Sequence, residues 1–164
     1  MKSASGVSPC ETEAGLNLMR SGVDAYTATG GRDFRPYFRA LLAEAALGPD
    51  PAAAGDVLTR TLEEVGATGG RWIEPELHRL RGELLLAGPE PDLDGAEAAF
   101  VRAVAVAARY RMRLWELRAA TSLARVHARR GVAGRGRDLL ARLHGWFPEG
   151  LETPDLRRAK AALG

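Results

Sequence analysis

The side chains that could carry out chemistry are few in this sequence, and they are scattered along it. Three histidines, His78, His127 and His144, lack a partner four residues away, the spacing that places two metal ligands on one helical face. The single cysteine, Cys10, can form no disulfide within the chain, and a catalytic thiol would need a positioned base beside it. We therefore expect no metal, no cofactor and no enzymatic activity.

Neighbouring carboxylates and glycine-rich segments are the other candidates for a chemical site. The carboxylates Glu63-Glu64, Glu74 and Glu76 are expected on solvated faces or in a turn, where they would add charge without acting as acid and base. The segments 66–70 (GATGG) and 131–136 (GVAGRG) follow no strand and precede no lysine, unlike a phosphate-binding loop. Both are interpreted as helix ends.

The composition favours an all-α protein. Hydrophobic residues make up 46% of the 164 positions, but they are mostly Ala and Leu, and only 6% of the chain is aromatic. Val, Ile and Thr are too sparse for several strands. Residues 1–13 lack the apolar segment of a signal peptide, and no apolar run is long enough to cross a membrane. We expect a cytoplasmic protein that does not associate with membranes.

Charge is unevenly distributed behind a formal net charge of +2. Residues 41–100 hold four arginines against twelve carboxylates, whereas residues 101–144 hold eleven arginines against Glu116 and Asp138. Three explanations fit this asymmetry: a basic binding face, two halves that attract each other, or arginines that only decorate solvated helix faces.

Prolines, glycines and periodic apolar residues divide the chain into helices. A disordered leader is expected over 1–10, because this segment is small and polar and lacks periodicity. The pentapeptide ATGGR occurs at 28–32 and again at 67–71, so two helices should end in the same way. The remaining chain, 11–164, is predicted to form one repeat domain with these parts: an unpaired helix over 11–29, repeat 1 over 34–66, repeat 2 over 72–110, repeat 3 over 114–147 and a capping helix over 153–163.

The segment 71–110 indicates how paired helices should pack. Gly82 stands in mid-helix, where glycine costs about 1 kcal/mol relative to alanine, so a neighbouring helix should lie too close for a side chain. Ala96, Phe100 and Ala103 form a facing stripe of small residues with one large one. Small residues recur at spacings of 40, 42 and 40 residues, at Ala14, Ala54, Ala96 and Gly136. The pattern predicts a right-handed α-solenoid of about three and a half tetratricopeptide-like antiparallel helix pairs.

Three segments carry a resemblance to a known family. They are ELHRLRGELLLA with AEAAFVRAVAVAARY, then LWELRAATSLAR, then LHGWFPEGLETPDLRRAKAAL. Over residues 11–164 the chain resembles the C-terminal tetratricopeptide region of large bacterial signalling proteins, the predicted ATPases and adenylate cyclases. The resemblance implies a protein-interaction or regulatory array without catalysis, because the chemistry of those proteins lies upstream of this region.

If the first helix of each pair lines the concave side, the side chains opposite its packing stripe form a groove. The predicted groove residues are Tyr37, Ala40, Glu44, Glu76, Arg79, Glu83, Arg118, Thr121, Arg125 and Arg129. This groove would grade from acidic to basic and suit a peptide or partner helix of the opposite gradient. We expect a non-catalytic scaffold that binds a protein or peptide partner.

Two further interactions stay open at this point. An open apolar face with Leu16, Met19 and Val23 on the first helix is consistent with a homodimer. Nucleic-acid binding is the alternative function, because clustered arginines favour contacts with a phosphate backbone. The arginines concerned are Arg109, Arg111, Arg113, Arg129, Arg130, Arg135 and Arg137.

Overall fold

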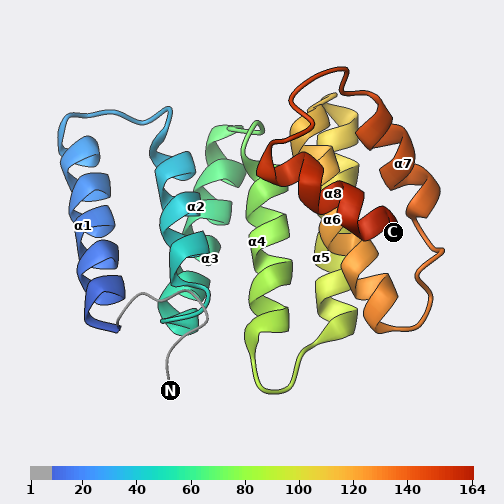
Figure 1. Cartoon of the computed structure of the whole chain (residues 1–164). Coiled ribbons are helices and arrows are strands. Elements are labelled where there is room, and N and C mark those ends of the chain that lie inside the picture. Colours follow the sequence, from blue (N-terminus) through green and yellow to red (C-terminus); the bar gives the residue numbers. More distant parts are fainter. Residues whose placement is uncertain (1–8) are drawn as a thin grey trace. The chain divides into compact units, whose positions relative to one another are not determined.

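The computed structural model describes residues 9–164, and every regular element in this part of the chain is an α-helix, which confirms the all-α prediction (Figure 1). The chain divides into two compact units, one that ends at Gly70 and one that spans Arg71–Gly164, and each is described by itself. None of the helices in residues 9–164 is both long enough and apolar enough to cross a membrane.

The described part of the first unit, residues 9–70, contains three helices, α1 (Pro9–Ala28), α2 (Arg35–Ala46) and α3 (Pro51–Thr68). Helix α2 packs against both of the others. Most of the leader expected over 1–10 lies outside the described residues, but its last two residues, Pro9 and Cys10, begin α1. Proline suits a first helical turn because its missing N–H has no helical acceptor there.

The repeated pentapeptide ends two helices in the same way, as predicted. Helix α1 ends at Ala28, the first residue of one copy of ATGGR, and α3 ends at Thr68, the second residue of the other, so the two ends differ by one residue. The first glycine of each copy takes a positive φ, +81° at Gly30 and +75° at Gly69. Only glycine adopts this conformation without a Cβ penalty, which explains the residue type at both helix ends.

The open face expected on the first helix is smaller than predicted. Leu16 is buried, because α1 packs against α2. Met19 and Val23 instead line an apolar pocket of about 300 Å³ together with Tyr26 and Phe38. The homodimer expected through this helix stays a prediction.

The second unit contains five helices: α4 (Glu74–Ala87), α5 (Leu93–Arg109), α6 (Arg113–Arg129), α7 (Arg137–Gly145) and α8 (Pro154–Leu163). Helices α4, α5 and α6 pack in succession, and α4 also contacts α6. The closing helix α8 packs against both α6 and α7 (Figure 1).

The glycine in mid-helix α4 marks a close helix approach, as expected. A Cβ atom at Gly82 would lie 2.4 Å from Cε1 of Phe100, a separation that atoms cannot tolerate. Phe100 is fully buried with Ala96 of the same helix and with Leu123 and Val126 of α6. The phenyl ring therefore occupies the space that a side chain on Gly82 would need.

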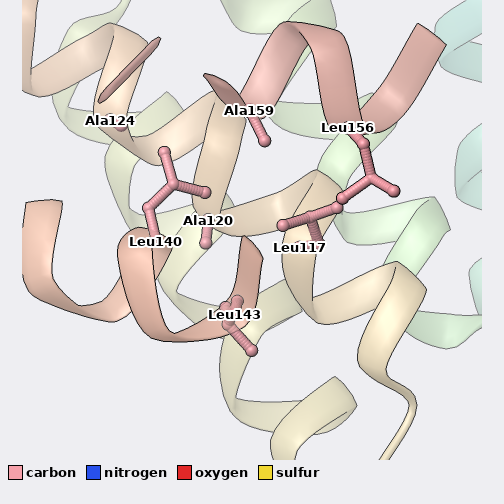
Figure 2. Close-up of a cluster of buried hydrophobic side chains, with 7 residues drawn as sticks. All are labelled: Leu117, Ala120, Ala124, Leu140, Leu143, Leu156 and Ala159. Atoms are coloured by element: carbon pink, nitrogen blue, oxygen red, sulfur yellow. The ribbon is translucent and has the colours of Figure 1, made fainter. Parts of the chain in front are cut away.

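Helix α8 is fastened to the unit by a second apolar cluster (Figure 2). Leu156 and Ala159 of α8 meet Leu140 and Leu143 of α7 over the surface of α6. The α6 residues in this cluster are Leu117, Ala120 and Ala124. Burial of the two leucines of α7 and of Leu156 fixes the position of α8, and so fixes the charged side chains that it carries.

Candidate functional site

A pocket of about 360 Å³ lies between α4, α6 and α8 in the second unit. Four arginines from the three helices line it: Arg79 from α4, Arg118 and Arg125 from α6, and Arg158 from α8. The one carboxylate in its lining is Asp155 at the start of α8. The pocket therefore combines cationic side chains that are far apart in the sequence.

A buried carboxylate organises the deep end of this pocket. Glu76 accepts two hydrogen bonds from Arg79, 2.9 Å from Nε and 2.7 Å from Nη2, in the bidentate geometry that guanidinium and carboxylate groups favour. Nη2 of Arg118 reaches the same carboxylate from α6 at 3.0 Å. The prediction that Glu76 is solvated is wrong, because Arg79 lies three residues along α4 and α6 brings Arg118 onto it.

Two further carboxylates hold the arginines nearer the pocket mouth. Oε1 of Glu83 accepts a 2.7 Å hydrogen bond from the Ser122 hydroxyl and lies 3.1 Å from Nη1 of Arg125. Asp155 lies 3.6 Å from Nε of Arg118 and 3.2 Å from Nη1 of Arg158. Four guanidinium groups thus surround three carboxylates, which leaves an excess of one positive charge.

The outer arginines face solvent. The side chains of Arg125 and Arg158 are 49% and 65% exposed, so their unused N–H groups point into water. The side chains of Arg79 and Arg118 are 9% and 17% exposed. A ligand that enters the pocket would meet the two exposed guanidinium groups first.

The structure gathers most of the predicted groove residues around this pocket. Glu76, Arg79, Glu83, Arg118, Thr121 and Arg125 all line it or contact its arginines. Thr121 is buried, and its hydroxyl donates to the carbonyl oxygen of Leu117 at 2.7 Å. Arg129, which is exposed one turn further along α6, is not part of the lining.

The groove residues predicted on α2 belong to the first unit. Tyr37 and Glu44 are both partly buried there. Ala40 is only 2% exposed, so the expectation that it faces the groove is wrong. This alanine belongs instead to the buried side of α2, with Leu42 and Ala43.

Sequence reasoning missed the residues that α8 adds. Asp155 and Arg158 stand three residues apart in α8, a spacing that predicts a salt bridge on one helical face. That signal was present in the sequence, but nothing in it placed this face over α6. Ser122 was missed for a related reason, since it stands beside the predicted Thr121 and its role depends on Glu83 of α4.

A second buried carboxylate lies at the start of α4. Glu74, also expected to be solvated, is 7% exposed and lies 3.0 Å from Nη1 of Arg71 and 3.7 Å from Nε2 of His78. Burial lowers the pKa of His78 below its ordinary value of 6.5, and the Glu74 carboxylate opposes that shift. The charge of Arg102 lowers the pKa of His78 further.

Two of the arginines proposed for nucleic-acid contact are held by carboxylates of α5. Arg130 binds Asp94 and lies 3.4 Å from Glu97, and the hydrogen bond that Arg130 donates to Asp94 raises the pKa of Arg130. Nη1 of Arg135 lies 3.6 Å from Glu97. Nε2 of His127 faces the same carboxylate at 3.2 Å, and its Nδ1 lies 2.7 Å from the carbonyl oxygen of Arg135. These contacts neutralise part of the basic surface.

Within residues 9–164, no three or more His, Cys, Asp or Glu side chains are grouped so that they could hold a metal ion. Comparisons with models of protein families, with curated proteins and with solved structures gave no match. The described chain is thus an all-α protein with an arginine-lined pocket, and its tetratricopeptide identity stays a prediction.

Proposed function

We propose that the chain is a non-catalytic interaction module that binds an acidic peptide or helix of a protein partner in the arginine-lined pocket. The observation that carries this proposal is the excess of guanidinium groups around Glu76, Glu83 and Asp155, with Arg125 and Arg158 exposed at the mouth. Guanidinium groups recognise carboxylates through paired N–H donors, so an acidic segment is the complementary ligand.

The pairing of charges supports a binding role over a catalytic one. Glu76 and Glu83 each contact more than one arginine, so both carboxylates are already engaged by guanidinium groups. Apart from the Asp155 carboxylate, which is paired with Arg118 and Arg158, the possible nucleophiles in the lining are the two hydroxyls of Thr121 and Ser122. Both hydroxyls already donate hydrogen bonds, to the Leu117 carbonyl oxygen and to Glu83.

The proposal includes a tetratricopeptide-like origin. The approach of Gly82 to Phe100 and the succession of α4, α5 and α6 support helix pairs of this type. A right-handed solenoid, descent from a bacterial signalling ATPase or cyclase, and a cytoplasmic location are parts of the same proposal. They derive from the sequence resemblance over residues 11–164.

The test is a selection of displayed random dodecapeptides on the whole chain, followed by affinity measurements on the recovered peptides. We expect acidic peptides whose affinity falls about tenfold when Arg125→Glu and Arg158→Glu are combined, because reversed charges repel the ligand. Arg60→Glu on α3 is the matched control, since Arg60 is exposed and forms no ion pair among the described residues. Recovery of peptides without acidic residues, or equal affinities for all variants, would refute the pocket as the binding site.

The nucleic-acid alternative has less support, because Arg130 and Arg135 are engaged by Asp94 and Glu97. Retention on immobilised DNA tests it with alanine at positions 129, 130, 135 and 137 together. Unchanged retention would eliminate the alternative, whereas a uniform loss of retention across DNA sequences would favour it over the peptide proposal.

A further inference from the structure

A second cavity, of about 360 Å³, lies where α6 begins and α7 ends. Leu139, Leu143 and Trp146 supply its apolar lining, and Arg113, Glu116 and Arg142 supply its charged groups. None of these residues takes part in the arginine-lined pocket between α4, α6 and α8. The cavity is therefore a separate feature of the second unit.

Trp146 is unusually exposed for its size. Trp146 is 58% exposed, whereas Trp72 is 37% exposed. The indole meets the Phe147 ring edge-on with centroids 5.1 Å apart, and Phe147 packs against the cluster that fastens α8. Tryptophan and arginine are the residues most enriched at the energetic centres of protein interfaces. The exposed Trp146 indole beside Arg113 and Arg142 has that composition.

The charge around this cavity is positive and only partly compensated. Glu116 is 4% exposed and its carboxylate lies 2.8 Å from Nη1 of Arg113, so these two charges neutralise each other. Arg142 is exposed and forms no ion pair among the described residues. Segment 139–148, which supplies four of the lining residues, contains no Asp or Glu. A ligand with negative charge is therefore complementary to the rim.

We propose that this cavity binds an acidic segment of a protein partner, which inserts one large apolar side chain against Leu139, Leu143 and Trp146. A carboxylate beside that side chain would pair with Arg142. The apolar lining favours a protein over a nucleic acid, because leucine side chains pack well against an apolar side chain. Single-stranded nucleic acids instead stack their bases on a series of aromatic side chains. This inference does not depend on the function proposed for the other pocket.

The indole N–H resonances of the whole chain provide the test. The chain has three tryptophans, and Trp146→Phe identifies the signal of Trp146 by its disappearance from the ¹⁵N–¹H spectrum. The probe is an acidic nonapeptide with a central phenylalanine, acetyl-DEDEFDEDE-amide. We expect saturable shifts of the Trp146 signal, with an affinity reduced about tenfold by Arg142→Glu.

The controls separate this site from general electrostatic attraction. Arg157→Glu makes the same charge reversal as Arg142→Glu, but at an exposed residue of α8 that forms no ion pair among the described residues. This variant should leave the peptide affinity within a factor of about two of the wild-type value. Arg125→Glu with Arg158→Glu should do the same at the Trp146 signal, which distinguishes the cavity from the arginine-lined pocket.

Each of the remaining outcomes would overturn the proposal. An equal response to a probe with glycine at the centre would contradict an apolar anchor. A Trp146 response to oligothymidine of similar charge, stronger than to the peptide, would assign the surface to nucleic acid. Absence of any shift at millimolar peptide would show that the cavity does not bind this class of ligand.

Discussion

The deep end of the arginine-lined pocket consists of charged side chains that are buried together. Glu76 and Arg79 are buried together, and Glu76 also contacts Arg118. Loss of one member of a buried ion pair leaves an uncompensated charge, whereas joint replacement by apolar residues removes the desolvation cost of both. The three side chains should therefore behave as one unit and not as independent contributors.

Glu76→Leu should reduce the free energy of unfolding by about 3 kcal/mol, because it leaves Arg79 and Arg118 without their shared carboxylate. The double variant Glu76→Leu with Arg79→Leu should lose less than the sum of the single losses. Urea denaturation followed by circular dichroism measures both. Strictly additive losses would show that the pair is not coupled and that the contact seen in the structure has little energetic weight.

His78 should make the free energy of unfolding depend on pH, in a direction that follows from its lowered pKa. Its pKa is lowered in the folded chain, so the unfolded chain binds more protons between that lowered pKa and 6.5. The free energy of unfolding should therefore fall as the pH decreases below 6.5. His78→Gln, which does not titrate, should flatten this slope in a series of urea denaturations.

The same series contains its own control. Above about pH 7.5 a histidine of lowered pKa is neutral in both the folded and the unfolded chain, so wild type and His78→Gln should show parallel stability curves there. A wild-type curve that rises on acidification, or an identical slope in the variant, would contradict the role assigned to His78.

At the scale of helices, the packing of α4 against α5 depends on the missing side chain at Gly82. Gly82→Ala should lower the free energy of unfolding by about 1 to 3 kcal/mol, because the fully buried Phe100 ring has nowhere to move. Alanine would otherwise stabilise a helix by about 1 kcal/mol relative to glycine. Gly22→Ala on α1 is the matched control, since a Cβ there would meet nothing within 4 Å. That variant should gain stability in the same thermal-denaturation assay.

Replacement of Phe100 tests whether its ring is the reason that Gly82→Ala is destabilising. Phe100→Leu should cost stability alone but less in the Gly82→Ala background, because the smaller side chain admits the new methyl group. Equal costs of Phe100→Leu in both backgrounds would mean that Gly82 is retained for a reason other than the proximity of the ring.

The helices and the Gly82 contact could be predicted from the sequence, because their causes are local. Proline and glycine act on the backbone of their own segment, as the two ATGGR copies show at Gly30 and Gly69. The partners of Glu76 could not be predicted in the same way. Helical periodicity places residues on a face of their own helix, but it does not say how α6 is rotated or where α8 folds back. Arg118 and Asp155 meet only after both are settled.

At the scale of the whole molecule, we expect the second unit to fold independently. It contains an apolar cluster around Phe100, another under α8, and the ion network centred on Glu76. The first unit has a thinner core, since among the described residues of α1 the buried apolar side chain is Leu16, while Leu18 is 76% exposed. The two units should therefore differ in stability when separated.

The fragment 71–164 should fold alone, with helical circular dichroism and one cooperative thermal transition, because the clusters around Phe100 and under α8 are built from residues of this unit. It should retain the acidic-peptide affinity proposed for the arginine-lined pocket, and it should be monomeric even if the whole chain dimerises through α1. Sedimentation and peptide titration on both chains measure these properties. A fragment that is unfolded, or that folds but loses peptide affinity, would mean that binding requires a continuous array across residues 11–164. The predicted solenoid, and not the second unit, would then be the functional entity.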